Sequence, residues 1–390
     1  MSKPKAGPYA GLRVLDFSMF LAGPYCGRLM ADMGAEVIKV EPPAGDFLRS
    51  APPVRNGHSA YFGQMNAGKK SVALDLKRPS ALAAVKRLIG TADVLIENFR
   101  PGVMARLGLG YDALSELRPE LIYCSISGYG QTGPKAGHAS FAPIIHAASG
   151  FDLLIPRYEE TIDRPVTHRY TVADILAATH ALAGIGAALY QRHITGEGEH
   201  LDVALMDTMY TVMAYEYAAA QFPGSKPIIF RPMRTLDGFI AIAPVSQANF
   251  EALARAAGHV EWMADERFAT RDARVDNWQE LLALIEAWTS SQAGNAAEQL
   301  LLAEGCPTSV HRDIVAARQD TQADHRGSRV PVTDAAGAYE VANCPIQFNR
   351  AAVGAGRAVP ALGEHGQAVL ESVGYSTDEL RSMLETGALR

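Results

Sequence analysis

Short apolar runs alternate with segments of helical spacing through the first third of this 390-residue chain, and this alternation constrains the fold more than any other feature. The runs are rich in β-branched residues and are bounded by turn-forming residues, as strands are. Because parallel strands need crossover connections of this length, the pattern predicts βαβ units and an α/β fold with a parallel sheet. The predicted strands are 12–17, 36–40, 71–76, 94–97 and 121–126, and the predicted helices between them are 25–33 and 80–88.

The remainder of the chain is more helical. Two long helical patterns cover residues 171–192 and 201–222, and a strand is expected at 238–244. These segments indicate a second lobe at roughly residues 225–320. Further helices are expected at 249–258, 277–291, 297–304 and 376–385.

Composition excludes several classes of protein. Hydrophobic residues make up 48% of the chain and charged residues 20%, which is enough apolar material for a sizeable core. The net charge of −6 argues against a nucleic-acid partner, since phosphate binders carry a basic excess. Polar residues and glycines interrupt the longest apolar tract, 173–190, so it predicts a buried helix and no membrane partner.

The cysteines and histidines do not form a metal-binding pattern. No C-x-x-C pair is present, and the histidines have no ligand spacing, so we predict no metal site and no disulfide framework. Scattered cysteines of this kind favour reduced thiols in a cytoplasm. The cysteines are Cys26, Cys124, Cys306 and Cys344.

The run from Gly128 to Gly133 matches G-x-G-x-x-G and follows a predicted strand. A dinucleotide site needs a helix that opens at these glycines, whereas Pro134 and Gly137 make poor helix here. We therefore interpret the run as a glycine-rich loop over a pocket.

Asp174 lies at the start of the apolar helix predicted from residue 171. An aspartate in the first helical turn is common, because it caps free amide groups and complements the helix dipole. A carboxylate at a buried helix start can also attack an activated carbonyl group. The local sequence does not separate these two interpretations.

The run 92–111 contains Glu-Asn-Phe-Arg-Pro-Gly and is followed by Ser-Gly-Tyr-Gly-Gln-Thr-Gly-Pro at 127–134. This run is the most specific of several ordered segments that together resemble the class III CoA-transferases, the CaiB/BaiF type that includes formyl-CoA transferase and carnitine CoA-transferase. The resemblance spans nearly the whole chain. Its other segments are 11–17, 22–24, 29–41, 66–77, 184–190, 195–198, 202–207 and 360–365.

The resemblance implies roles for particular residues. Asp174 matches the position of the family's nucleophilic aspartate, before a small-residue helix that leads to Thr-Gly-Glu-Gly. Two further residues, Tyr61 and Phe141, match positions that line the pocket for the acid substrate. The positions that match CoA-contacting residues are Leu21, Ala22, Leu74, Lys77, Asn98, Phe99 and Arg106.

The resemblance also implies an architecture. It predicts an interlocked, ring-like homodimer with a Rossmann-like large domain built from both termini and a smaller middle α+β domain. The expected parts are 1–205 and 326–390 in the large domain, a linker helix at 206–224, and the small domain at 225–325.

The expected reaction is transfer of CoA from an acyl-CoA thioester to a free carboxylic acid, through an aspartyl anhydride and an aspartyl-CoA thioester. CoA is then a substrate, and no tightly bound cofactor is expected. Backbone amides within 128–133 are candidates for stabilising the oxyanion or excluding water. Two alternatives stay open: a 2-methylacyl-CoA racemase or epimerase, and an inactive CoA-binding homologue.

Two departures from the family pattern bear on these alternatives. Phe141-Ala142 stands where many members have Tyr-Asp or Tyr-Glu and where the racemases have His-Asp, which argues against racemase chemistry. Pro42 replaces a basic residue that some members place near the cofactor.

The choice of acid is suggested by basic residues. A basic cluster occupies the region where some members carry a glycine-rich flap, and it favours a dicarboxylate such as succinate. The alternative is that these side chains face solvent or support the dimer. The cluster consists of Lys226, Arg231 and Arg234, and His168 and Arg169, which lie shortly before Asp174, favour the same kind of acid.

Overall fold

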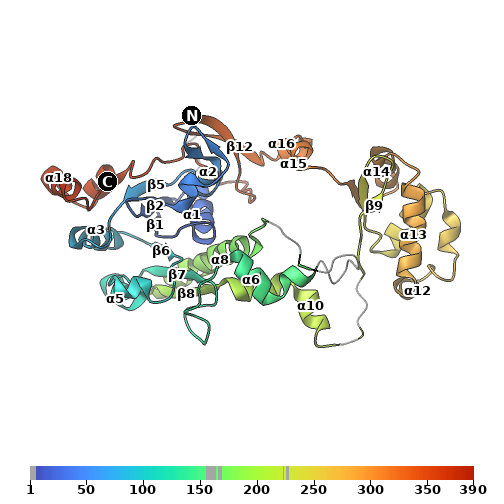
Figure 1. The fold of residues 1–390 in the computed structure, drawn as a ribbon, viewed down its shortest axis with the longest axis horizontal. Helices are drawn as coiled ribbons and strands as arrows, with labels where there is room; N and C mark the ends of the chain where they lie inside the picture. Colours follow the sequence, from blue (N-terminus) through green and yellow to red (C-terminus); the bar gives the residue numbers. More distant parts are fainter. Residues whose placement is uncertain (1–5, 155–163, 166–168, 223, 225–227) are drawn as a thin grey trace. The chain divides into compact units, whose positions relative to one another are not determined.

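The computed structural model describes residues 6–154, 164–165, 169–222, 224 and 228–390. His168 and Lys226 lie outside the described residues. The chain divides into two compact units, Met1–Tyr217 with Asp324–Arg390 and Ala218–Ala323. The ribbon of both is shown in Figure 1.

The first unit is built on a six-stranded parallel sheet in the order β5-β2-β1-β6-β7-β8. This confirms the predicted α/β fold with a parallel sheet. Counting only the strands of this sheet, the order is the 3-2-1-4-5-6 arrangement of doubly wound folds. The strands are β1 (Arg13–Asp16), β2 (Glu36–Glu41), β5 (Lys70–Ala73), β6 (Val94–Glu97), β7 (Ile122–Ser127) and β8 (Glu199–Ala204).

The strand order creates a crevice next to β1. The chain leaves β1 to one side to form β2 and later returns to form β6 on the other side. The loops after β1 and β6 therefore diverge at the carboxyl edge of the sheet, which is where ligands bind in such folds.

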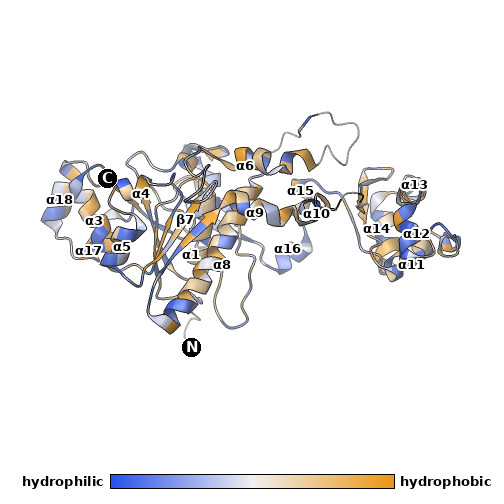
Figure 2. Cartoon of the chain, turned by 90° about the horizontal axis from the view of Figure 1, so that it is seen from below, coloured by the Kyte–Doolittle hydropathy of each residue, from blue (hydrophilic) through white to orange (hydrophobic). Residues whose placement is uncertain are grey.

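Apolar side chains cover both faces of the sheet. On one face, α1 (Ala22–Asp32) and α8 (Val172–Thr195) pack against strand residues such as Val14 and Ile122. Figure 2 shows strand β7 as hydrophobic, whereas α5 and α18 are hydrophilic over much of their surface.

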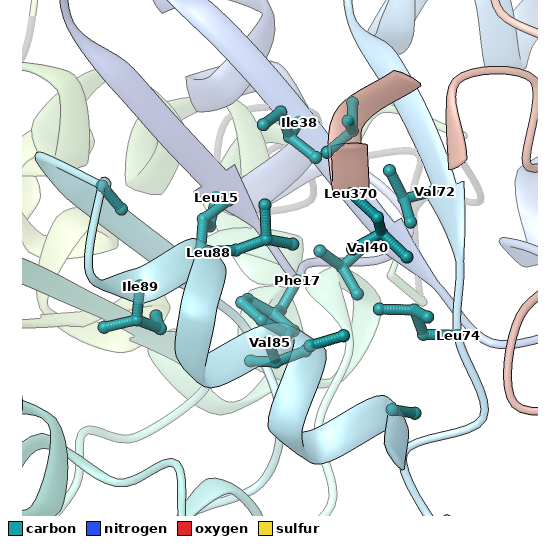
Figure 3. Packing of buried hydrophobic residues seen from close by; sticks show 14 of the residues in the cluster. Leu15, Phe17, Ile38, Val40, Val72, Leu74, Val85, Leu88, Ile89 and Leu370 are labelled. Atoms are coloured by element: carbon teal, nitrogen blue, oxygen red, sulfur yellow. The ribbon is translucent and has the colours of Figure 1, made fainter. Parts of the chain in front are cut away.

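The opposite face is covered by helices from both ends of the unit. Leu88 of α3 (Pro79–Ile89) and Leu370 of α17 (Gly366–Glu371) lie against Leu15 and Val40 of the sheet (Figure 3). Leu114 of α5 (Tyr111–Leu117) and Leu380 of α18 (Thr377–Glu385) belong to the same core. Residues near the C-terminus thus complete the core that the N-terminal strands begin.

Smaller elements surround this sheet. They are the 3-10 turns Phe47–Ser50 and Phe151–Leu153, α2 (Ala60–Asn66), α4 (Val103–Arg106), α6 (Ala142–Ser149), and the hairpins β3 (Val54–Arg55) with β4 (His58–Ser59) and β12 (Arg329–Asp334) with β13 (Gly337–Ala342). Of the remaining helices, α15 (Ile314–Ala317) belongs to the second unit, and α16 (Thr321–His325) spans the boundary between the units.

The continuous helix predicted at 201–222 was wrong in two respects, because the helical part begins later and is divided into two helices. Residues Glu199–Ala204 form β8, which pairs with β7 over its whole length, and the helices are α9 (Leu205–Val212) and α10 (Ala214–Ala219). Leu201 and Val203 contribute to the core on alternate positions, which is strand periodicity. The apolar residues of α9 follow β8 directly in the sequence, so the helical pattern appeared to begin earlier than the helix does.

The second unit has its own core. Its antiparallel sheet has the order β11-β10-β9, and the buried Phe250, Trp278 and Leu281 come from its helices. The elements are β9 (Met233–Arg234), β10 (Phe239–Ile242), β11 (Thr308–Val310), α11 (Gln247–Ala256), a 3-10 turn (Val260–Met263), α12 (Arg271–Asp276), α13 (Trp278–Thr289) and α14 (Gly294–Ala303).

By length and composition alone, α8 is apolar enough to cross a membrane. Its alanines at 173, 177 and 181 and Ile185 are fully buried in the core beside the sheet. We therefore interpret α8 as a core helix of the first unit.

Candidate active site

A cavity of about 380 Å³ lies at the carboxyl edge of the parallel sheet. Loops after β1, β6 and β7 line it, together with the first turns of α6 and α8. The structure brings six of the predicted site residues to this cavity. They are Leu21, Ala22, Asn98, Phe99, Phe141 and Asp174.

Asp174 is the third residue of α8 and lines the cavity half-buried. Within the described part of the chain its carboxylate has no hydrogen-bond partner. Burial raises its pKa to about 7. The cause is the loss of water around the carboxylate, which disfavours its charged form. A first-turn aspartate of the ordinary capping kind does not have this environment.

His146 fixes the first turn of α8 and was missed by the sequence analysis. The Ala173 N–H donates to Nε2 of the buried His146 at 3.1 Å, so the imidazole takes one of the free amide groups of the helix. His146 comes from α6, and its ring contacts Phe151 at a centroid distance of 5.2 Å. No feature of its sequence spacing marks this role.

Tyr61, from α2, lies near the start of the same helix. Burial raises the pKa of its phenol, a hydrogen bond with Thr171 opposes the rise, and the charge of Asp174 adds to it. Tyr61 does not line the cavity described above, but it is an electrostatic neighbour of Asp174.

Two fully buried ion pairs support the loop after β1. Lys69 Nζ lies 2.7 Å from Asp16 Oδ2, and Lys39 Nζ lies 2.9 Å from Asp46 Oδ2, with none of the four side chains exposed. Lys39 also donates to the carbonyl of Ser18 at 2.7 Å, and the Ser18 N–H donates to Asp16 at 3.0 Å. The pairs thereby hold the loop that carries the cavity residues after Ser18.

The pKa values of this cluster reflect competing effects. Burial alone would raise the pKa of Asp16, but the charges of Lys69 and Lys39 outweigh it and lower the pKa. For Lys69 burial wins and lowers the pKa to about 8, although Asp16 opposes the change. Both groups are therefore mainly charged at neutral pH, and each depends on the other.

The loops after β1 and β6 are tied together. Asn98 accepts from the Met19 N–H at 2.8 Å and donates to the Met19 carbonyl at 2.7 Å. Phe20 adopts a left-handed backbone with φ of 65°, and its ring contacts Phe47 at 5.1 Å and Phe141 at 5.3 Å. The rim of the cavity is therefore apolar and held by specific contacts.

The glycine-rich loop passes tightly over the end of β7. A Cβ atom at Gly128 would lie 1.7 Å from Ser140 Oγ, so this position requires glycine. The next helix, α6, begins only at Ala142. The glycines therefore do not open a helix that could receive a pyrophosphate, as the sequence analysis argued.

Other predicted residues lie away from this cavity. Lys77 and Arg106 are exposed. Leu74 is fully buried and bridges to Leu389, so contact with CoA there would require the segment around Leu389 to move.

The basic residues suggested for acid binding are partly engaged elsewhere. Arg231 pairs with Glu286 at 3.1 Å, and the Arg234 guanidinium lies 5.2 Å from the Phe239 ring centre, all within the second unit. Arg169 is exposed, and its charge acts on Tyr61. Across the described residues, no group of three or more His, Cys, Asp and Glu could hold a metal ion.

Comparison with known proteins gives the family. Residues 9–366 match CoA-transferase family III. The chain is 36% identical to the succinate–glutarate CoA-transferase of Agrobacterium fabrum, over 93% of this chain and 95% of that protein. It is 35% identical to the succinyl-CoA–D-citramalate CoA-transferase of Chloroflexus aurantiacus, over 96% of each chain.

A crystal structure of a CaiB/BaiF family protein from Brucella suis has the same fold. Its TM-score is 0.81 at 33% identity, and the match covers 95% of this chain and all of that one. The chain belongs to CoA-transferase family III and is an enzyme of the CoA-transferase class. The resemblance inferred from the sequence segments is confirmed.

We predict that Lys69→Met destabilises the first unit much more than Lys70→Met. The first change leaves the buried Asp16 carboxylate without its partner, which costs about 3–5 kcal/mol. Lys70 is partly exposed and pairs with Glu36, so its loss costs about 1 kcal/mol or less. Urea unfolding measures both, and equal shifts of the two midpoints would refute the structural role of the Asp16–Lys69 pair.

Proposed function

We propose that this enzyme transfers CoA from an acyl-CoA to a free dicarboxylate, with Asp174 as the nucleophile. The observation that carries the proposal is the half-buried carboxylate of Asp174, which lines the cavity without a hydrogen-bond partner in the described chain. The related CoA-transferases named above act on succinate, glutarate and citramalate, which supports a dicarboxylate.

The transfer takes place in two symmetrical halves. The Asp174 carboxylate attacks the thioester carbonyl, CoA thiolate leaves, and a mixed anhydride remains. Thiolate then attacks the aspartyl carbonyl, which releases the donor acid and leaves an aspartyl-CoA thioester. The acceptor carboxylate attacks this thioester, and thiolate attacks the acceptor side of the second anhydride, which restores Asp174.

The environment of Asp174 suits these steps. A poorly hydrated carboxylate with a raised pKa is more basic than one in water, and no donor from the described residues has to be displaced before it reacts. The anhydride must also be kept from water, and the apolar side chains of Phe20 and Phe141 at the cavity, with Phe47 stacked on Phe20, support this.

We assign the CoA to the carboxyl edge of the sheet. Leu21, Ala22, Asn98 and Phe99 line the cavity and are proposed to contact the part of CoA near its thiol. The more distant Lys77 and Arg106 are exposed cations, and they are proposed to meet the phosphate groups. Tyr61 and Phe141 are proposed to border the acid pocket.

The second charge of the dicarboxylate needs a basic partner. Among the residues that line the described cavity, the basic side chains are Arg100 and His138, and both are exposed. We propose that Arg100 meets the distal carboxylate, because a guanidinium can bind it with two hydrogen bonds.

We further propose that the enzyme is an interlocked homodimer in the cytoplasm, with a large domain of residues 1–205 and 326–390 and a small domain of residues 225–325 joined by 206–224. Support comes from large apolar side chains that stay exposed in the single chain, such as Tyr190, Ile194 and Tyr215. The cysteines are free and buried, which suits a reducing compartment.

Asp174→Asn should lower kcat by at least about a thousandfold, because an amide cannot form the anhydride. Incubation of the wild type with succinyl-CoA should give a covalent CoA adduct on the peptide that contains Asp174, and the variant should give none. The matched control is Asp207→Asn, since Asp207 is also the third residue of its helix but is exposed. An Asp174→Asn enzyme that retained transfer within tenfold of the wild type would exclude Asp174 as the nucleophile.

The pH dependence should follow the raised pKa of Asp174. With a pKa of about 7 in the free enzyme, kcat/KM should rise about tenfold per pH unit below pH 7 and level off above it. Because the folded state holds this proton more tightly than the unfolded state, the wild type should lose stability relative to Asp174→Asn as the pH rises from about 4 to above 7. A kcat/KM that stays constant from about pH 5 to about pH 8, on both sides of the expected pKa, would contradict the assignment of this pKa to Asp174.

The dimer is tested by sedimentation over a range of protein concentrations. An interlocked pair should sediment as a dimer with no dissociation on dilution, because separation requires unfolding. A monomer, or a dimer that dissociates reversibly at micromolar concentration, would argue against interlocking.

A further inference from the structure

Ser127 is the last residue of β7 and lines the same cavity as Asp174. The residue is 8% exposed, and its hydroxyl oxygen is shielded from water. Within the described chain this hydroxyl has no hydrogen-bond partner. A buried polar group without a partner is uncommon in a folded protein and calls for a physical explanation.

The other buried serines of the described chain all have partners. The Ser125 hydroxyl lies 3.0 Å from His200 Nε2, and Ser71 donates to Glu41 at 2.7 Å. Ser59 donates to the Ala51 carbonyl at 2.6 Å, and Ser18 donates to Asp16. Ser127 is therefore the exception, and it is the one of these serines that lines the cavity.

The other polar side chains that line the cavity beside Asp174 either have partners or are less buried than Ser127, as the half-buried Ser140 is. The Asn98 amide makes two hydrogen bonds with Met19, and Thr171 interacts with Tyr61. Arg100 and His138 are exposed. The Ser127 hydroxyl is thus a buried donor at the cavity that no acceptor of the described residues occupies. Ile126 and Leu205, which also line the cavity, are apolar.

We propose that the Ser127 hydroxyl donates a hydrogen bond to the thioester carbonyl oxygen while the Asp174 carboxylate attacks. This proposal rests on the proposed function. A rotation about the Cα–Cβ bond of Ser127 turns the hydroxyl toward the bound acyl group. The donor then has its strongest effect in the transition state, when negative charge develops on the oxygen.

The electron balance of the step is simple. A bond forms between a carboxylate oxygen of Asp174 and the carbonyl carbon, and the π pair moves onto the carbonyl oxygen. Ser127 donates a hydrogen bond to this oxygen and keeps its proton. The pair then returns, the carbon–sulfur bond breaks, and CoA leaves as a thiolate. The acceptor half of the reaction uses the same donor.

The test is Ser127→Ala with succinyl-CoA and glutarate as substrates. We expect kcat to fall by about 10- to 1000-fold, with KM for succinyl-CoA changed by less than about threefold. The melting temperature should stay the same or rise, because the change removes a buried hydroxyl that has no hydrogen-bond partner among the described residues. Ser127→Cys keeps a weak donor and should retain an intermediate kcat.

The matched control is Ser125→Ala, two residues earlier on the same strand. Its hydroxyl is bonded, so this change should lower the melting temperature while kcat falls less than about tenfold. The inference is overturned if Ser127→Ala keeps kcat within about twofold, or if its kcat falls only together with the melting temperature and with CoA binding. If the wild type transfers CoA to no acid at all, the proposed function fails and this inference fails with it.

Discussion

The geometry of the candidate site depends on two fully buried ion pairs, one on Asp16 at the end of β1 and one on Lys39 of β2. The pairs Asp16–Lys69 and Lys39–Asp46 hold the loop after β1 in place. Helix α1 approaches them closely at Gly27, where a Cβ atom would lie 2.9 Å from Asp16 Oδ2. Breaking such a pair costs more than a surface pair does, because the remaining charge stays buried without a partner. These buried ion pairs therefore hold in place the loop after β1, which forms part of the cavity wall.

A second set of contacts prepares Asp174. His146 takes the amide hydrogen of Ala173 and so holds the first turn of α8, while Asp174 itself has no hydrogen-bond partner in the described chain. Burial disfavours the charged form of this carboxylate and raises its pKa to about 7. A capping carboxylate would be held in the opposite way, charged and hydrogen-bonded. The arrangement fits a group that forms a covalent bond with its substrate.

The sequence predicted those parts of the fold that depend on local periodicity. The strands β1, β2, β5, β6 and β7 were found because each is a short apolar run between turn residues. The strand β8 was missed because its pairing with β7 is a long-range contact. The local sequence left two interpretations of Asp174 open, the family resemblance favoured the nucleophile, and the burial of the carboxylate supports that proposal. His146 and Ser127 were missed because their importance depends on burial and on contacts between distant elements. Arg231 was given too much weight because its partner, Glu286, is distant in sequence.

The central claim is that the oxygen atoms of the acids pass through Asp174. It is tested most directly with an acceptor dicarboxylate labelled with heavy oxygen in its carboxylates, incubated with the enzyme and succinyl-CoA. The acceptor attacks the aspartyl-CoA thioester through one labelled oxygen and displaces thiolate, which forms the second anhydride. When thiolate then attacks the acceptor carbonyl, the bridging labelled oxygen stays on Asp174. The peptide that contains Asp174 should therefore gain heavy oxygen during turnover, as measured by mass spectrometry. Transfer of CoA without label in that peptide would contradict the account.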